Sequence, residues 1–382
     1  MAVVRMFCRL VKGSRALQVL LVAFVAFLLY AFYVWKNANT FTTITKMIYS
    51  DVEPRLKPKH PESIDLSFLQ QLHDDTDVLT DSGDDDGDSQ FEHDDEIYVI
   101  ITFSKAKQNY ALQNKFRTCV SSMFYQTRTR IMFYIIGDDV SQNIAENIMH
   151  EVSNNNSFQV MHLDVHLLAK KLNRTIFKMQ KYFTKPGAYY SDPLFFLSLV
   201  IHRVMPLDLH RVIMLDSDLK FRSDINQLYR LFGEFKEENI IGIAREMQPV
   251  YRHTFWQYRK NNPGTRVGDP PPNGLTGFNS GVLLLDLDKM RKSDLYNSLI
   301  DSDAVFNLTE KFYFKGHLGD QDFFTLLSLD YENLFYILPC TWNRQLCEWW
   351  RHHGYADIFD EYFTCKSHIN IYHGNCNTPF PV

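Results

Sequence analysis

Apolar runs and helical stretches alternate along the chain from Ile97 onward. The apolar, β-rich runs have the pattern of strands covered on both faces. They lie at 97–103, 131–137, 158–165, 211–215, 239–246 and 278–287. Stretches of helical character separate them, at 109–124, 141–151 and 191–205. This alternation predicts an α/β fold in which helical crossovers flank a mostly parallel, Rossmann-like sheet.

The longest apolar run lies near the N-terminus, where Ala16–Trp35 is 20 residues without a charged side chain. At about 1.5 Å per residue, such a helix crosses the hydrocarbon core of a membrane. Basic residues precede it, and the positive-inside rule keeps the 1–15 tail cytosolic. A cleaved signal peptide is the alternative, but the run is long and lacks a small-residue cleavage site. We therefore expect an uncleaved signal anchor at 16–35, with the rest of the chain lumenal.

Residues 36–96 lose the core-forming pattern and become strongly acidic between His73 and Glu96. Such a composition cannot bury enough apolar surface to offset chain entropy, so we expect a flexible lumenal stem. Calcium binding by its aspartates is a weaker alternative, because the EF-hand spacing is missing. An ordered domain is then expected over 97–382.

Charge and cysteine usage narrow the function. The net charge of −5 indicates no polyanion-binding surface, so nucleic-acid binding is a poor hypothesis. Four of the six cysteines lie close together, and disulfides explain them better than zinc because no C-x-x-C spacing occurs. Spacing alone leaves three pairings open for Cys340, Cys347, Cys365 and Cys376. Three glycosylation sequons also suit a lumenal domain, at Asn155, Asn173 and Asn307.

One expected strand ends in two carboxylates. In RVIMLDSDLKF, Asp216 and Asp218 follow the apolar run 211–215. The other D-x-D pairs lie in the acidic stem or near expected helix starts, where carboxylates favour the positive end of the dipole. Side chains at i and i+2 face the same way, and open α/β sheets bind ligands at this end of the strand. Such a pair is typical of a site for magnesium, manganese or calcium.

Haloacid-dehalogenase-type phosphatases also place a D-x-D sequence at a strand end. Their pattern generally continues with threonine or valine two positions on, where this chain has Lys220. Their aspartates also follow the first strand of the domain, whereas Asp216 follows the fourth expected strand. We therefore discount a phosphatase.

Four segments, in the order VIMLDSDLKF, GFNSGVLLLDL, GHLGDQDFF and IYHGN, resemble the retaining glycosyltransferases of family 8. The resemblance covers residue 97 to the C-terminus and implies a glycosyltransferase-A fold and a nucleotide-sugar donor. Further segments, IIGIAREMQPVYRHTFWQYR and CTWNRQLCEWW, are most similar to members that use UDP-xylose. Those members extend xylosyl-glucose on EGF-like repeats of Notch-type proteins, from the endoplasmic reticulum membrane. The alternatives are a UDP-galactose or UDP-glucose donor, or a non-catalytic protein that binds EGF-like repeats; a homodimer stays open.

The resemblance also implies residue roles. Asp216, Asp218 and His373 would bind manganese, and Asp320 and Gln321 would lie beneath the anomeric carbon as catalytic residues. Nucleotide-sugar contacts are implied for Thr102, Phe103, Ser104, Ser217, Asn279, Ser280, Leu318, Gln321, Gly374 and Asn375. The implied disulfides are Cys340–Cys365 and Cys347–Cys376, with Cys119 a buried free thiol. Acceptor contacts are expected of Trp349, Trp350, Arg252 and His253.

The expected chemistry is front-face transfer, because Gln321 is a poor nucleophile and Asp320 serves equally well as an acceptor for a sugar hydroxyl. A diphosphate oxygen would then deprotonate the acceptor hydroxyl. The chain also departs from its family in two places. No lysine follows His373, so another donor must contact the diphosphate. Aromatic side chains, with Phe195 and Phe196 among them, stand where hexose-using relatives carry a basic residue, which we expect to favour xylose.

Overall fold

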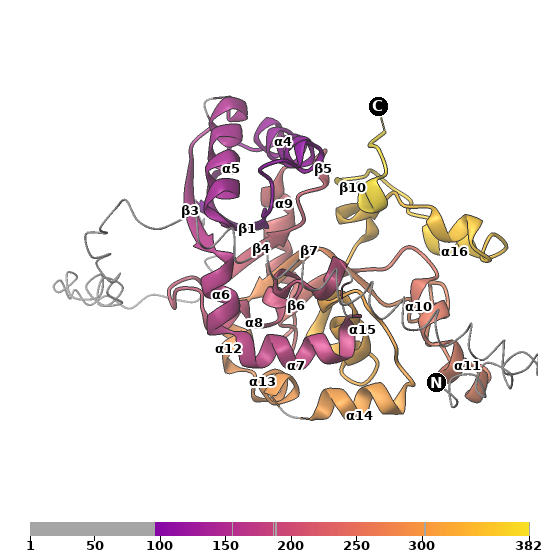
Figure 1. Ribbon diagram of the computed structural model, residues 1–382. Helices are drawn as coiled ribbons and strands as arrows, with labels where there is room; N and C mark the ends of the chain where they lie inside the picture. Colours follow the sequence, from indigo (N-terminus) through magenta and orange to yellow (C-terminus); the bar gives the residue numbers. More distant parts are fainter. Residues whose placement is uncertain (1–95, 155, 186, 188, 302, 382) are drawn as a thin grey trace, which may run out of the picture. The chain divides into compact units, whose positions relative to one another are not determined.

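The computed structural model of this protein describes residues 96–381, apart from 155, 186, 188 and 302 (Figure 1). The expected tail, signal anchor and stem up to residue 95 lie outside this part, as does Asn155. Among the described residues, no helix combines the length and apolar character needed to cross a membrane.

A seven-stranded sheet with the order β3-β2-β1-β4-β7-β6-β8 forms the centre of the described domain (Figure 1). Its strands are β1 (Glu96–Thr102), β2 (Arg130–Gly137), β3 (Phe158–Asp164), β4 (Arg211–Leu215), β6 (Ile241–Arg245), β7 (Phe278–Asp286) and β8 (Phe335–Leu338). Only β7 runs antiparallel to its neighbours, β4 and β6, and the other pairs in this sheet are parallel. The predicted mostly parallel α/β sheet is therefore confirmed.

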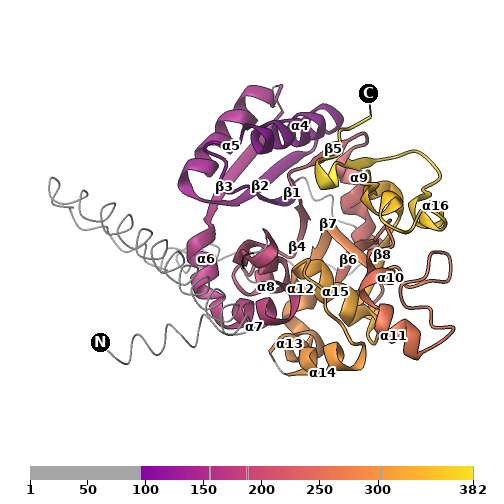
Figure 2. The same cartoon turned by 45° about the vertical axis from the view of Figure 1, so that its right-hand side comes forward.

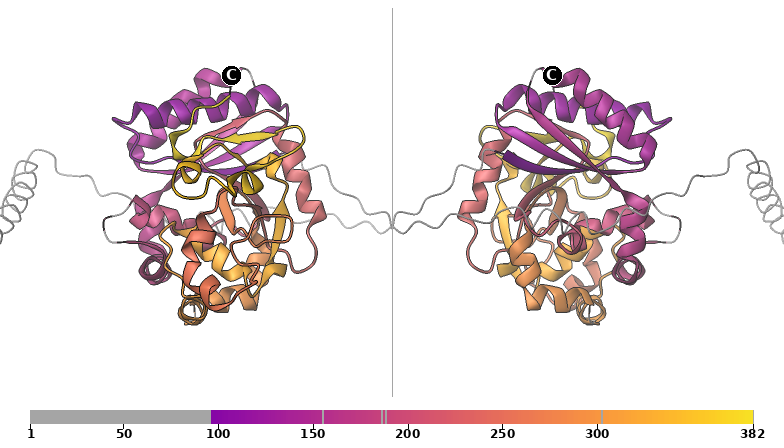
Figure 3. Two further views of the ribbon diagram at one scale, coloured as in Figure 1. Left: turned by 90° about the vertical axis from the view of Figure 1, so that its right-hand side faces the viewer. Right: turned by 90° about the vertical axis from the view of Figure 1, so that its left-hand side faces the viewer.

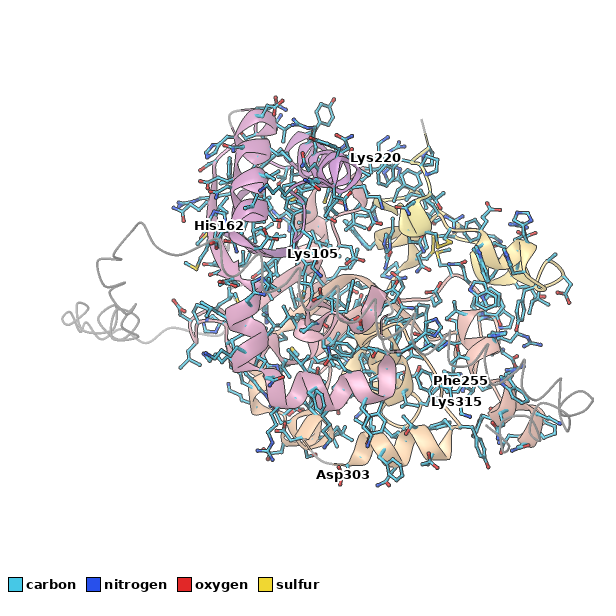
Figure 4. The ribbon with its side chains drawn as sticks, viewed as in Figure 1. Lys105, His162, Lys220, Phe255, Asp303 and Lys315 are labelled. Carbon is cyan, nitrogen blue, oxygen red and sulfur yellow. A yellow bond between two sulfur atoms is a disulfide. The ribbon has the colours of Figure 1, made fainter. Side chains whose placement is uncertain are left out.

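The reversed direction of β7 separates two D-x-D pairs that look alike in sequence. Asp286, at the end of β7, pairs with Arg211 at the start of β4, so it lies at the opposite edge of the sheet from Asp216. Asp286 caps α12 (Leu287–Lys292) by accepting a hydrogen bond from the backbone N–H of Lys289. The D-x-D pair that ends at Asp303 is also remote from Asp218. In Figure 4, Asp303 lies far from Lys220, which is two residues after Asp218 in the sequence. The helix-start interpretation of the 286/288 pair is thus confirmed.

Helices cover both faces of the sheet (Figure 2). Val99 on β1 and Ile135 on β2 pack against α4 (Tyr110–Gln126), α5 (Asp139–Val152) and α9 (Ile225–Tyr229) on one face. Ile100 and Ile136 point to the other face, where a second core forms. The elements near that core are α6 (Val165–Lys171), α7 (Asn173–Phe183), α8 (Leu197–Val200), α13 (Asp294–Asp301), α14 (Ala304–Lys311) and α15 (Asp320–Ser328). Alternate residues of one strand therefore serve two cores, which explains the continuous apolar runs.

A second, three-stranded sheet has the order β5-β10-β9. It contains β5 (Leu219–Phe221), β9 (Arg344–Gln345) and β10 (Ile371–His373). The C-terminal segment, in yellow, thereby lies beside β5 and near α4 (Figure 3). Two disulfides hold this region, Cys340–Cys365 and Cys347–Cys376, so both implied pairings are confirmed. Cys119 is a buried free cysteine, as expected, and burial raises the pKa of its thiol.

The segment expected as one helix over 191–205 is broken into short pieces, so that prediction is wrong. It contains η2 (Pro193–Phe196), α8 and η3 (Ile201–Arg203), preceded by η1 (Tyr189–Ser191). The backbone leaves helical geometry at Phe196 and Val200. Every side chain from 196 to 202 is buried, so packing on all sides rather than one amphipathic face sets its path.

Candidate active site

Two carboxylates and one imidazole meet between the two sheets. Asp216 follows β4, Asp218 precedes β5, and His373 ends β10, opposite Leu219 on β5. The His373 Nε2 atom lies 3.3 Å from Asp218 Oδ1 and 3.6 Å from Asp216 Oδ2. One ligand atom from each residue lies within 4.8 Å of the other two. Oxygen and imidazole ligands at this spacing suit a divalent cation.

The three side chains of this triad have pKa values shifted in different directions. Burial by itself lowers the pKa of His373, but the adjacent Asp218 and Asp216 carboxylates outweigh it and raise that pKa. The pKa of Asp216 is raised because surrounding protein limits the hydration of its carboxylate, although the side chain is half-exposed, and because the Asp218 carboxylate lies beside it. The pKa of Asp218 is held low despite burial, by His373 and Lys115. Two neighbouring carboxylates pushed apart in pKa are characteristic of functional sites.

The absence of a side chain at Gly281 leaves the space that the His373 imidazole occupies. A Cβ added at Gly281 would lie 2.3 Å from His373 Cε1 and 2.7 Å from Nδ1. The carbonyl oxygen of Gly281 accepts a hydrogen bond from the Asp216 N–H at 2.9 Å. The Gly374 N–H donates to the carbonyl oxygen of Asp218 at 2.8 Å. The sequence segments GFNSG, LDSDL and YHGN, each weak alone, therefore build one site.

Asp320 begins α15 and is held by three donors. The hydroxyls of Ser198 and Ser280 donate to its two carboxylate oxygens, and the Gln321 N–H donates at 2.7 Å. Burial raises the pKa of Asp320 to about 6, and these hydrogen bonds oppose that rise. Both oxygens already have fixed donors, so this carboxylate is a positioned acceptor rather than a free nucleophile.

Asp322 supports the start of the same helix. Gly319 is the N-cap residue, with a φ of +69° that favours glycine, so Asp322 lies in the first turn rather than at the cap itself. Its carboxylate accepts from the Leu318 N–H at 2.7 Å and from the Tyr251 hydroxyl at 2.9 Å. Burial raises its pKa to about 7. The Asp322 side chain thus stabilises the start of α15 from within its first turn.

Glu246 is a site residue that sequence reasoning missed. It follows β6, which runs in the same direction as β4, so it lies at the same edge of the sheet as Asp216. Its Oε2 atom accepts from Gln321 Nε2 at 3.2 Å and from Asn279 Nδ2 at 3.3 Å. Burial raises the pKa of Glu246 to about 7, opposed by the hydrogen bond from Asn279. A carboxylate at the end of the NIIGIARE strand was the available signal.

Lys115 on α4 is the second missed residue. Its Nζ atom lies 3.3 Å from Asp218 Oδ2 and 2.8 Å from Asn377 Oδ1. It brings a positive charge to the site of a chain that has no lysine after His373. Nothing in the helical pattern of 109–124 distinguishes it from a surface lysine.

The remaining predicted nucleotide-sugar residues lie around this centre. Thr102 ends β1, whose Ile101 pairs with Leu215 just before Asp216, and Phe103 and Ser104 follow it. The Phe103 side chain is fully buried against Phe116, and the Ser104 hydroxyl donates to Asp138. Their direct contacts with a nucleotide therefore stay predictions, as do those of half-buried Ser217 and Leu318.

Asn375 and Asn279 have structural partners. The Asn375 Oδ1 atom accepts from the backbone N–H groups of Leu346 and Cys347, at 3.0 and 2.9 Å. The amide of Asn279 is buried and bonds Glu246 and Asn343. Sugar or phosphate contacts by these two side chains also stay predictions.

Three of the expected acceptor residues, His253, Trp349 and Trp350, form an aromatic cluster. His353 and Tyr355 complete it. Trp349 is 50% exposed and stacks on His353 at 3.5 Å between ring centroids. Trp350 packs against His253 at 4.9 Å. Arg252 differs, because its guanidinium forms an ion pair with Asp269 at 2.6 Å.

The sequons that can be located, Asn173 and Asn307, are both exposed. Asn173 begins α7 and Asn307 lies on α14. Both side chains are therefore accessible to modification.

Residues 101–357 match the family described as Glycosyl transferase family 8. The chain belongs to this family. Mouse and human proteins named Xyloside xylosyltransferase 1 are each 47% identical to it over 294 residues, which is 75% of this chain and 75% of theirs. The crystal structure of mouse Xyloside xylosyltransferase 1, apo form, matches with a TM-score of 0.72 and 48% identity, covering 75% of this chain and 100% of that one.

A more distant family relative is the human Xylosyl- and glucuronyltransferase LARGE1. It is 29% identical over 248 residues, which cover 64% of this chain and 29% of its own length. Family 8 membership and the Asp-Asp-His triad together place the candidate site at the edge of the seven-stranded sheet where β4 and β6 end, next to β10 of the second sheet.

Proposed function

We propose that this protein is a retaining, manganese-dependent xylosyltransferase that uses UDP-xylose. Its acceptor is xylosyl-glucose O-linked to EGF-like repeats of Notch-type proteins, to which it adds xylose in α-1,3 linkage. The observation that carries the proposal is the Asp216–Asp218–His373 triad, in a chain 47% identical to proteins named Xyloside xylosyltransferase 1. The two disulfides support a lumenal, oxidising location, which we assign to the endoplasmic reticulum membrane.

Asp216, Asp218 and His373 would hold the cation, since two carboxylates and an imidazole form a donor set that manganese accepts. When bound, the cation neutralises the diphosphate and stabilises the negative charge that develops on it. Lys115 adds a second positive charge beside Asp218 and supplies the phosphate contact for which no lysine follows His373. The cation site and Lys115 would thus both bring positive charge to the diphosphate.

The chain's own groups favour front-face transfer. The Nε2–H of Gln321 donates a hydrogen bond to Glu246, and we assign the amide oxygen of Gln321 to stabilising the positively charged anomeric centre. Asp320 accepts hydrogen bonds at both oxygens and is best suited to position a sugar hydroxyl. Glu246, the carboxylate next to Gln321, is buried and accepts hydrogen bonds from Gln321 and Asn279, so it is not placed to attack the sugar, and a diphosphate oxygen takes the acceptor proton. A covalent xylosyl-Asp320 species in the unmodified enzyme would refute this route.

The aromatic cluster suits an acceptor. Exposed Trp349, held by His353 and by the Cys347–Cys376 disulfide nearby, offers a rigid apolar face for a sugar ring or for an EGF-like surface. Arg252 is neutralised by Asp269, so it is the weaker acceptor contact.

The experiment is a donor panel offered to the full-length protein together with an EGF-like repeat carrying xylosyl-glucose. We expect a mass increase of one pentose with UDP-xylose and Mn²⁺, and loss of it in Asp216→Ala. A hexose increase from UDP-glucose or UDP-galactose would keep the family but change the donor. Binding of the repeat without any transfer, and without thermal stabilisation by UDP and Mn²⁺, would establish a non-catalytic binder instead.

A further inference from the structure

A line of buried amide and carboxylate side chains joins His373 to Gln321. Its members, which we name the amide relay, are Asn343, Asn279 and Glu246, exposed by 0%, 7% and 3%. Asn343 lies between η6 (Cys340–Trp342) and β9, Asn279 on β7, and Glu246 after β6. None of the three lies at the surface, so their hydrogen bonds are made inside the protein rather than with bulk water.

The backbone decides the orientation of Asn343. Its Nδ2 donates to the Asn279 carbonyl oxygen at 3.3 Å and to Asn279 Oδ1 at 2.9 Å. A backbone carbonyl only accepts, so the amide nitrogen must face it, and Asn343 Oδ1 is left to face His373 Nδ1 at 3.0 Å. Because that oxygen can only accept, Nδ1 carries a proton. The Nε2 lone pair is therefore the one that His373 offers to a cation between Asp216 and Asp218.

A second backbone group orients Asn279. The Gly281 N–H donates to Asn279 Oδ1 at 3.2 Å, so Asn279 Nδ2 faces Glu246 Oε2 at 3.3 Å. The same Oε2 accepts from Gln321 Nε2 at 3.2 Å. This bond fixes the nitrogen of the Gln321 amide on Glu246.

We propose that Asn343 and Glu246 are positioning residues that align the two halves of the reaction. Asn343 keeps the proton of His373 on Nδ1, so that Nε2 binds the cation, and Glu246 orients the Gln321 amide toward the anomeric carbon. Asn279 joins the two, so one set of buried bonds sets both the cation and the sugar subsite. The inference rests on the proposed function, because it assigns roles toward a cation and a donor sugar.

The Asn343 half is tested by Mn²⁺ affinity, measured by electron paramagnetic resonance on the full-length protein without nucleotide. Asn343→Ala is expected to weaken Mn²⁺ binding by about 10- to 100-fold, the usual loss when a partner of a metal-bound histidine is removed. Asn370→Ala is the matched control. It removes bonds to Ser223 and Thr341 just before β10, without touching the relay, and should leave the affinity unchanged.

A double-mutant cycle separates positioning from general damage. In a His373→Ala background, Asn343→Ala should cause little further loss, because its partner is already gone. Equal losses in both backgrounds, or an unchanged affinity in Asn343→Ala, would overturn this role. If the unmutated protein binds no Mn²⁺, the proposed function fails at that point; if it binds normally and only the coupling is missing, the relay alone fails.

The Glu246 half is tested by steady-state kinetics. Glu246→Ala should lower kcat by about 10- to 100-fold with a nearly constant KM for UDP-xylose, since a misplaced amide affects the reacting geometry more than donor binding. Glu246→Gln keeps an oxygen that accepts from Gln321 and Asn279, so it should restore most of kcat. A loss through KM alone, or a Gln variant as poor as the Ala variant, would contradict the assignment.

Discussion

The imidazole of His373 lies against the backbone of Gly281, where a Cβ would come within 2.3 Å of Cε1. Gly281→Ala should therefore push His373 away from Asp216 and Asp218 and weaken Mn²⁺ binding by at least about 10-fold. Calorimetric titration with Mn²⁺ measures the change.

Gly264→Ala serves as its control. A Cβ there meets nothing within 4 Å, and a φ of +80° gives this variant a backbone cost without touching the site. An alanine at 281 that leaves Mn²⁺ affinity intact would show that His373 is not a ligand.

Lys115 is expected to change the affinity for the cation and the affinity for the nucleotide in opposite directions. It repels a cation at Asp218 and attracts a diphosphate, so Lys115→Ala should bind Mn²⁺ alone more tightly but UDP in the presence of Mn²⁺ about tenfold more weakly. Both affinities are measured by titration calorimetry.

Lys115→Arg should retain most UDP binding because it keeps the charge. Lys220→Ala is the control, since the Lys220 ammonium donates to the Pro381 carbonyl oxygen near the C-terminus (Figure 4). Tighter UDP binding in Lys115→Ala would exclude a phosphate contact.

The structure selects between the two phenylalanines expected to favour xylose. Phe196 is fully buried in the core, whereas Phe195 lies against Gly319, next to Asp320. Phe195→Ala should therefore reduce the preference for UDP-xylose over UDP-glucose by about tenfold, by admitting the larger sugar. Competition between the two donors, read by mass, gives the ratio. An unchanged ratio would remove Phe195 from the donor-sugar wall.

Asp138 makes the domain's stability depend on pH. Burial alone raises the pKa of Asp138, but hydrogen bonds from Lys105, Ser141 and Ser104 outweigh it and hold that pKa well below its usual range. Because the folded pKa is depressed, its stabilisation is complete above the unfolded value of about 3.9 and is lost as pH falls toward the folded value.

The change to test is Asp138→Ala, which removes the N-cap of α5 and should cost about 1 kcal/mol at pH 7. The difference in thermal midpoint from the unmutated domain should narrow below about pH 4. Asp138→Asn keeps an acceptor and should lose less. A constant difference down to acid pH would show that the carboxylate charge contributes nothing.

Much of the sheet could be predicted from sequence, because β1, β2 and β4 are largely buried and read as continuous apolar runs. The direction of β7 could not, since an antiparallel strand with two covered faces has the same pattern. The break in 191–205 was missed for a similar reason: its side chains are buried on all sides, and no periodicity marks where the helix stops.

Asp216, Asp218 and His373 were found because ordered motifs surround them. Lys115, Glu246 and Asn343 were not. Each is an ordinary residue of its own segment and gains a role only through a contact with a distant segment of the chain.

By itself, the sequence determined which strands are buried in the core and that the acid pair Asp216 and Asp218 follows one of them, since apolar character and charge are local properties of a chain. Tertiary structure decided which distant groups surround that pair. A lysine, a glutamate and two amides become site residues only when hydrogen bonds of about 3 Å bring them together, and such distances depend on packing rather than on spacing along the chain.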